Sequence, residues 1–196
     1  EFPLHPHEGF EIMTFVFKGS VEHFDTASKV WTPLDEGGLQ VIQAGSGVKH
    51  AERIIKGTEL FQIWFDPDFS KSLRKDTAYK DYKKSVFKTE EKEGVKTLTY
   101  LGDNSPVYFE TEGIEVNKRS FKPGKHTEVL DKDSTYSYYL LDGQMYINDT
   151  ELEKDGFLAI DDTEVVEYKV GQGAELFMIK SPSTIAYNRF VQRYNQ

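Results

Sequence analysis

The sequence predicts an all-β protein built from two copies of one antiparallel sandwich or barrel. Short segments rich in β-branched and aromatic residues alternate apolar with polar positions, which is the period of a half-buried strand. Clusters of Gly, Pro, Asp and Ser separate these segments at short intervals, as in antiparallel β proteins. The pattern then repeats once along the 196 residues, which indicates two structural units.

The first copy is expected to span residues 1–68 as an N-terminal domain. Its clearest strand runs over 11–17 and ends at a Lys-Gly turn, and segments of the same kind cover 38–43 and 59–65. Most aromatic side chains in these strands are expected to face the core, and some to line an apolar pocket.

After an Asp-Pro-Asp sequence the composition changes. Residues 69–93 are charged and rich in lysine, with a short helix or turn expected within 76–88. We interpret this segment as a solvated linker between two domains, because charged stretches without apolar periodicity are typical of connections.

Strand patterning resumes at 95–101, and the C-terminal domain is expected to span 94–180. The two copies share three sequence blocks in the same order. "FVFKGSVEHF" resembles "YLLDGQMYIN", "GGLQVIQ" resembles "DGFLAID", and "GTELFQIWF" resembles "GAELFMI". The aromatic and basic tail, 181–196, is expected to pack back on the N-terminal domain.

Charge and cysteine content exclude several function classes. The 33 acidic and 24 basic residues give a net charge of −9, which disfavours nucleic acid and anionic membranes as partners. No cysteine is present, so disulfides, thiolate metal sites and cysteine nucleophiles are excluded. No apolar run is long enough to span a membrane, and a cytoplasmic protein is expected. The chain starts at Glu1 without an initiator Met, so we expect that an N-terminal segment is missing.

Two pairs of metal-binding side chains suggest a site in the first copy. Residues two apart on a strand point to the same face, so His5 points with His7, and His50 with Glu52. If neighbouring strands bring the pairs together, three imidazoles and one carboxylate form a site for a divalent first-row metal. A lone His on a strand is usually an ordinary polar residue, but two such pairs are less often accidental.

The second copy lacks these residue types at the matching places. Alignment on the turn glycines puts Val129, Asp131, Val166 and Tyr168 where the two pairs stand in the first copy. The second copy keeps its strand pattern without them. This comparison favours one metal site, in the first copy.

Three other polar residues have plainer interpretations. Glu11 is expected to orient an imidazole through a hydrogen bond or, equally well, to serve as a structural carboxylate. His23 lies just after a turn and is interpreted as a surface or loop residue, and His126, in the metal-free copy, as structural.

The segments "FPLHPHEGFE" and "IQAGSGVKHAE" resemble the pirin family of the bicupin superfamily. The resemblance implies two tandem cupin-type antiparallel β-barrels, a metal held by His5, His7, His50 and Glu52 in the first, and none in the second. It also implies strand structure before the His-Pro-His motif, which the chain as given lacks. Glu8 stands where the family usually has Arg, which inverts the charge beside the site.

The same resemblance implies a metal-dependent dioxygenase that acts on a flavonol such as quercetin, with dioxygen as the second substrate. Glu52 would then be both a metal ligand and the general base. Iron(II) is the favoured metal, one ion per chain, with manganese, nickel, copper and zinc as alternatives. The rival that the resemblance implies is a metal- or redox-responsive regulatory protein, which binds a transcription factor or metabolic enzyme without turnover.

Overall fold

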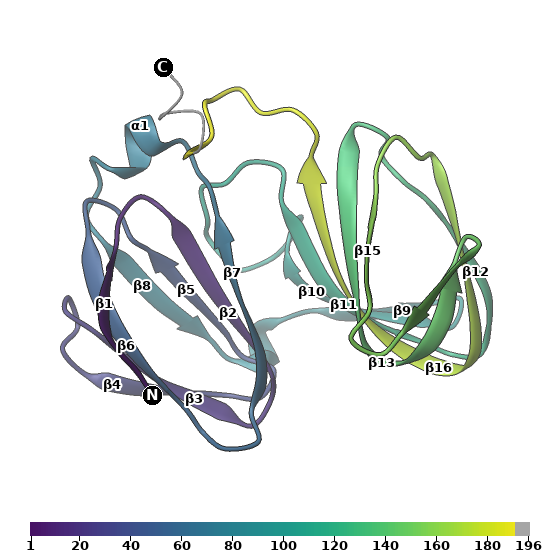
Figure 1. Ribbon diagram of the computed structural model, residues 1–196, viewed down its shortest axis with the longest axis horizontal. Helices are drawn as coiled ribbons and strands as arrows, with labels where there is room; N and C mark the ends of the chain where they lie inside the picture. The colour runs from purple at the N-terminus through teal and green to yellow at the C-terminus, as the bar shows by residue number, and fades with distance from the viewer. Residues whose placement is uncertain (191–196) are drawn as a thin grey trace. The chain divides into compact units, whose positions relative to one another are not determined.

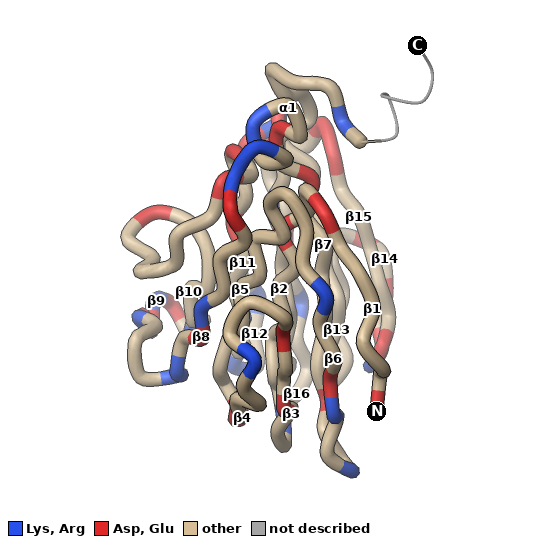
Figure 2. Tube along the Cα trace, turned by 90° about the vertical axis from the view of Figure 1, so that its left-hand side faces the viewer, with Lys and Arg blue, Asp and Glu red and all other residues tan. Residues whose placement is uncertain are grey.

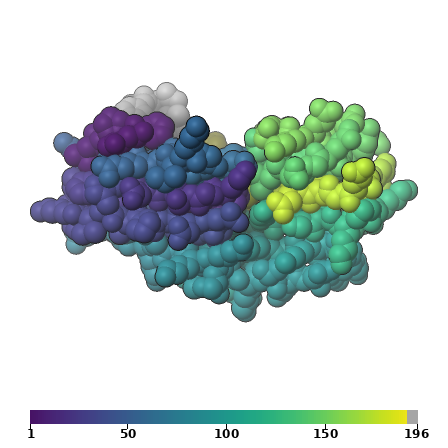
Figure 3. Space-filling view, turned by 90° about the horizontal axis from the view of Figure 1, so that it is seen from below, coloured from purple at the N-terminus to yellow at the C-terminus, as the bar shows by residue number. Residues whose placement is uncertain are grey.

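Nearly every element of the computed structural model, which describes residues 1–190, is a β-strand (Figure 1). Contacts divide the chain into two units. The first holds residues 1–86, 107–111 and 186–190, and the second holds 87–106 and 112–185. In Figure 3 the first unit is mostly purple to blue and the second mostly teal to yellow. The predicted all-β class with two β-units is confirmed.

The first unit contains two four-stranded antiparallel sheets. One sheet has the order β1-β6-β3-β4 and the other the order β7-β2-β5-β8. The strands are β1 Phe2–His7, β2 Glu11–Lys18, β3 Ser20–Asp25, β4 Trp31–Asp35, β5 Leu39–Gln43, β6 Val48–Ile54, β7 Glu59–Phe65 and β8 Ala78–Tyr82. The consecutive strands β1 and β2 therefore belong to different sheets.

The turn from β1 to β2 requires glycine. Gly9 has a φ of 75°, a left-handed conformation that side chains disfavour. A Cβ atom at this position would also lie 2.2 Å from the Phe69 ring, far inside van der Waals contact. Gly9 thus lets the chain leave β1 directly after His7 and cross to the other sheet.

Burial in the first unit follows the position of each strand in its sheet. Strand β3, which the sequence did not predict, alternates between buried and half-buried residues. Strands β2 and β5, at the centre of their sheet, are buried at nearly every position, so both of their faces are covered. The apolar core includes a cluster of Ile12, Ile42, Ala44 and Val48 and a cluster of Val16, Val21 and Leu34.

The second unit is a single eight-stranded antiparallel sheet. Its main order is β14-β13-β16-β11-β10-β9, with β12 paired to β16 and β15 to β13. The strands are β9 Thr89–Lys92, β10 Val95–Leu101, β11 Glu115–Phe121, β12 Gly124–Val129, β13 Ser134–Ile147, β14 Thr150–Glu153, β15 Phe157–Ile160 and β16 Val165–Pro182. Register shifts beside Asp142 and Gly143 interrupt the long β13–β16 ladder, which lets these strands bend around a core that includes Tyr138 and Tyr168.

Residues 69–93, interpreted above as a linker, contain four short elements. Helix α1 (Phe69–Ser72) begins after Asp68, whose side chain accepts a hydrogen bond from the Ser70 amide. Strand β8 pairs with β5, the 3-10 turn η1 covers Lys84–Val86, and β9 pairs with β10. The segment therefore contributes a strand to each unit.

Of the predicted tail, Ser181 and Pro182 end strand β16 of the second unit, whereas Tyr187 and Phe190 contact the first unit. The Phe190 amide donates to Asp66 Oδ2 at 2.7 Å, and the Tyr187 hydroxyl donates to the Asp66 carbonyl at 2.9 Å. The remainder of the predicted tail packing, at 191–196, lies outside the described residues.

Acidic and basic residues are interspersed along the described chain (Figure 2). Within residues 1–190, no helix has the length and apolar character needed to cross a membrane.

Candidate metal centre

Strands β1, β6 and β3 place polar side chains side by side on one face of their sheet. His5 lies opposite His50 in the β1–β6 pair, and Asp25 lies opposite His50 in the β3–β6 pair. His23 lies opposite Glu52. Residues that face each other across antiparallel strands share a sheet face, so this register gathers five titratable groups. All except His5 are buried, which places this face in the interior of the unit.

Three of the predicted ligands come together as a cluster. The ring centroids of His5 and His50 lie 4.3 Å apart, those of His7 and His50 4.7 Å, and those of His5 and His7 4.8 Å. One ring nitrogen from each lies within 4.8 Å of the others. Two strands thus bring together imidazoles that stand 43 to 45 positions apart in the sequence.

The nitrogens of this cluster are suited to a metal. His7 Nε2 and both ring nitrogens of His50 are buried and have no hydrogen-bond partner. His5 Nδ1 lies 2.8 Å from the Pro3 carbonyl, which can only accept, so a neutral His5 ring keeps the lone pair on Nε2. Buried polar atoms without partners are costly. A divalent ion would remove that cost for the one nitrogen of each neutral ring that carries the lone pair.

Burial also sets the protonation state of the cluster. Burial and the neighbouring His5 lower the pKa of His7. Burial, together with the adjacent histidines, lowers the pKa of His50 to about 3. Both rings are therefore neutral near pH 7, and the neutral imidazole is the form that binds metals.

Glu52 projects from the same face as His50, two residues further along β6. Its Oε1 accepts a 2.6 Å hydrogen bond from the Gln62 amide on β7. Burial raises the pKa of the Glu52 carboxyl, whereas His5 and the Gln62 hydrogen bond act in the opposite direction. Among the described residues, the group of ligand atoms within 4.8 Å of one another contains the three histidines and not Glu52.

His23 lies in the interior, so its interpretation as a surface or loop residue is wrong. It sits on β3 with no solvent exposure. Its ring stacks on Tyr79 at 4.6 Å and lies 5.3 Å from the His50 ring, measured between centroids. Burial lowers the pKa of His23 to about 4, although Asp25 acts to raise it. The missed signal was the alternation of Val21, His23 and Asp25 along one strand face.

Glu11 is a structural carboxylate and does not orient an imidazole. Its Oε2 accepts hydrogen bonds from the Thr111 amide and hydroxyl at 2.8 and 2.6 Å, and its Oε1 accepts from Gln43 and the Glu110 amide. Glu11 also lies on β2, in the other sheet from His5 and His7. It therefore ties residues 107–111 to the first unit and is not an imidazole partner.

The second unit fills the matching place with an ion pair. Both nitrogens of the Arg119 fork donate to the Glu128 carboxylate, with Nη2 to Oε1 at 2.9 Å. The Tyr168 hydroxyl donates to the same carboxylate at 2.7 Å. Glu128 lies opposite Val166, the residue aligned with His50, so it takes the place of His5. Alignment on the turn glycines, which put Val129 there, was wrong by one residue.

His126 is bound within the second unit. Its Nδ1 lies 3.1 Å from the Glu93 carbonyl and its Nε2 3.0 Å from the Lys122 carbonyl. Both contacts are local and support the structural interpretation of His126.

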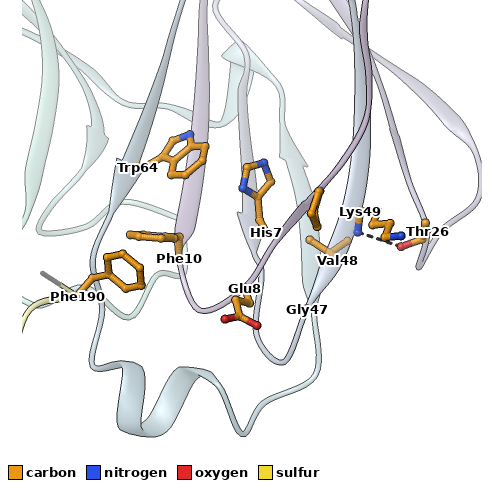
Figure 4. Close-up of a pocket in the computed structure, with 10 residues that line it drawn as sticks. His7, Glu8, Phe10, Thr26, Gly47, Val48, Lys49, Trp64 and Phe190 are labelled. Carbon is orange, nitrogen blue, oxygen red and sulfur yellow. Dashed lines mark hydrogen bonds between the residues drawn. The ribbon is translucent and has the colours of Figure 1, made fainter. Parts of the chain in front are cut away.

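A pocket of about 650 Å³ opens beside His7 in the first unit (Figure 4). Three aromatic rings gather on one side of His7 in the figure, and Lys49 and Thr26 lie on the other side. The lining residues are Pro6, His7, Glu8, Phe10, Thr26, Gly47, Val48, Lys49, Trp64 and Phe190. The sequence predicted that some aromatic side chains of the first-copy strands line such a pocket, and Trp64 of the 59–65 strand does so, but the sequence did not indicate Phe190.

Comparisons with known proteins agree with this geometry. The family model described as pirin matches residues 1–65. The chain is 28% identical to pirin from Rattus norvegicus over 160 residues, which are 78% of this chain and 54% of that protein. It is 41% identical to quercetin 2,3-dioxygenase from Escherichia coli strain K12 over 71 residues, which are 34% of this chain and 30% of that protein. The chain thus spans about half the length of the rat pirin that it matches.

Solved structures share the fold over almost the whole chain. A quercetin 2,3-dioxygenase from Acinetobacter baumannii superposes with a TM-score of 0.81 at 19% identity, over 98% of this chain and 75% of that one. The bacterial pirin YhhW from Escherichia coli, solved in complex with nickel(II), gives a TM-score of 0.73 at 21% identity, over 93% and 77% of the two chains. The predicted resemblance is therefore confirmed: residues 1–65 match the pirin family, and the chain has the cupin-type fold of solved pirin and quercetin 2,3-dioxygenase structures.

Proposed function

We propose that this protein is a pirin-like, metal-dependent dioxygenase that opens flavonols such as quercetin. The observation that carries the proposal is the cluster of His5, His7 and His50, with unpartnered nitrogens, beside an aromatic-walled pocket. The similarity to quercetin 2,3-dioxygenases supports the choice of substrate class.

The pocket provides a surface for a flat aromatic substrate. Trp64 packs edge-on against His7 with ring centroids 4.5 Å apart, and Phe10 lies 5.3 Å from Trp64. Ligand sites of this kind are mostly apolar, with a few polar groups that fix orientation. A flavonol would lie along these rings with its hydroxyl and keto oxygens directed at the histidines.

Glu52 is the proposed general base. Burial raises the pKa of the Glu52 carboxyl, which brings that pKa closer to the near-neutral value that suits a general base. Gln62 occupies Oε1 at 2.6 Å, so Oε2 is the atom that we expect to take the proton from the flavonol hydroxyl. Gln62 thereby fixes the orientation of the carboxylate toward the substrate.

We propose that one divalent ion per chain is bound by four ligands, His5, His7, His50 and Glu52. When bound, that ion would supply Lewis-acid and redox chemistry for the reaction with dioxygen. The mixture of imidazole and carboxylate favours iron(II), and manganese, nickel, copper and zinc remain alternatives because such ligand sets accept several metals.

The test is aerobic incubation of metal-loaded protein with quercetin, followed by the loss of flavonol absorbance. We expect the wild-type protein to consume quercetin, the His50→Ala protein to be inactive, and the His126→Ala protein to match wild type. His126 is the matched control because it is a histidine of the second unit, whose ring nitrogens lie against backbone carbonyls.

Equal rates for wild type and His50→Ala would reject the dioxygenase. Wild-type protein that binds the metal but leaves quercetin unchanged would instead favour the non-catalytic role, in which the metal state controls binding to another protein.

A further inference from the structure

The C-terminal segment supplies one wall of the pocket beside His7. Phe190 lines this pocket although it stands 183 positions after His7 in the sequence. Figure 4 shows its ring next to Phe10 and on the same side of His7 as Trp64. Residues 186–190 therefore complete a site whose other lining residues lie within the first 65 positions.

Two hydrogen bonds to one residue hold this segment. The backbone amide of Phe190 donates to Asp66 Oδ2 at 2.7 Å, and the Tyr187 hydroxyl donates to the Asp66 carbonyl at 2.9 Å. Asp66 directly follows strand β7, which carries Trp64. The residue that anchors the tail therefore lies two positions after Trp64, the central ring of the pocket wall.

The rings form a continuous series that starts at a proposed metal ligand. Trp64 contacts His7 at 4.5 Å, Phe10 contacts Trp64 at 5.3 Å, and Phe190 contacts Phe10 at 5.0 Å, all between centroids. Phe69 supports the far end at 5.1 Å from Phe190. These separations are typical of favourable aromatic pairs. A ligand with one ring could contact Trp64 alone, whereas a longer flat ligand would reach Phe190.

The opposite side of the pocket differs in chemistry. It is lined by Thr26, Gly47, Val48 and Lys49, without an aromatic side chain. The Lys49 amide donates to the Thr26 hydroxyl at 3.2 Å, which ties these two residues together. Stacking contacts are therefore available on one side only, and Phe190 sets how far that side extends.

We propose that Phe190 is a specificity-determining residue that selects multi-ring aromatic ligands over single-ring ones. The choice of a flavonol as the multi-ring ligand rests on the proposed function. Asp66 is a positioning residue that acts by holding the backbone of Phe190 against Phe10.

Trp64 makes the proposal measurable without turnover. The chain has two tryptophans, and in a Trp31→Phe background the quenching of Trp64 fluorescence reports ligand binding in the pocket. Nickel-loaded protein would be titrated with quercetin and with catechol, in the absence of oxygen. Phe190→Ala should weaken quercetin binding on the order of tenfold, the size expected for one aromatic contact. Catechol binding should change less than twofold.

Three further variants separate specificity from folding. Phe190→Tyr keeps the ring and should restore quercetin affinity. Asp66→Ala should lower the quercetin-to-catechol preference in the same direction, by less than Phe190→Ala. Phe157→Ala removes a phenylalanine that is 64% exposed in the second unit and should have no effect.

Unchanged quercetin affinity in Phe190→Ala, or an equal loss for both ligands, would overturn the proposal. So would a wild-type protein that does not bind quercetin. A wild-type protein that binds quercetin with the predicted preference but does not turn it over in air would reject the dioxygenase and leave the role of Phe190 intact.

Discussion

The two units differ in how the polar side chains at equivalent strand pairs find partners. At the β1–β6 strand pair of the first unit, His5 faces His50, and both ring nitrogens of His50 lack a partner. At the corresponding β12–β16 pair of the second unit, Glu128 faces Val166 and binds Arg119 and Tyr168. In the second unit the protein itself supplies the partners of Glu128, whereas in the first unit the buried nitrogens of His50 have none.

This difference indicates which unit requires a bound metal to satisfy its buried polar groups. The half-buried ion pair of Arg119 and Glu128, with its additional hydrogen bond from Tyr168, is satisfied by the protein alone. Buried imidazoles without partners are not satisfied, and a metal ion is the ligand that their lone pairs suit best. We therefore expect the stability of the second unit to depend on its own side chains and that of the first to depend on a metal.

The largest effect is expected from breaking the ion pair. Arg119→Ala leaves the Glu128 carboxylate without its main partner, which should destabilise the second unit by about 3 kcal/mol. Hydrogen exchange of peptides from β11, β12 and β16 measures this change. Lys122→Ala, which breaks the exposed pair with Glu91, is the control and should change the stability far less, because solvent screens exposed ion pairs. An equal, small effect of both variants would contradict the comparison.

A similar effect is expected from adding metal to the first unit. Nickel(II) at about 100 times its Kd should stabilise this unit by about 2.7 kcal/mol through mass action. Both tryptophans, Trp31 and Trp64, lie in the first unit, so urea unfolding followed by tryptophan fluorescence reports on it. Metal-dependent stabilisation should disappear in His50→Ala and persist in His126→Ala. Stabilisation of the second unit by the metal would count against the account.

A smaller effect is expected from Tyr168→Phe. The change deletes the hydroxyl that donates to Glu128 at 2.7 Å and keeps the ring in the core. The loss of one hydrogen bond to a charged group should cost about 1.5 kcal/mol in the second unit. Hydrogen exchange should show this loss only in the second unit, and unchanged exchange would mean that Arg119 alone satisfies the carboxylate.

The smallest change in stability is expected when the second unit is brought to acidic pH. Burial acts to raise the pKa of Glu128, but the hydrogen bonds from Arg119 and Tyr168 outweigh it and hold that pKa below 4.5, its ordinary value. A depressed carboxyl pKa contributes stability that is present above the ordinary value and is lost as the pH falls through the folded-state pKa. The second unit should therefore lose stability only below about pH 4.5. Glu128→Gln should flatten this part of the curve, and an unchanged curve would assign the acid sensitivity to other groups.

The sequence predicted the parts of the site that depend on local periodicity. His5 with His7, and His50 with Glu52, follow from the two-residue period of a strand. His23 was missed because the alternation of Val21, His23 and Asp25 marks a strand face but does not tell that pairing between β3 and β6 turns this face inward.

Other features depended on contacts between distant segments. Strand β8 was hidden by the lysine-rich sequence around it, although the strand itself holds one lysine, Lys80, between Tyr79 and Tyr82. The contribution of Phe190 to the pocket comes from the far end of the chain. The hydrogen bonds of Arg119 with Glu128 join β11 to β12. The alignment of the two copies had placed β12 one residue away from its observed register with β16.

The metal content of untagged protein tests the central claim most directly. Elemental analysis should find one divalent ion per chain in the wild type and in His126→Ala, and none in His50→Ala. Equal metal content in wild type and His50→Ala, or two ions per chain in the wild type, would contradict a single centre built on His5, His7 and His50.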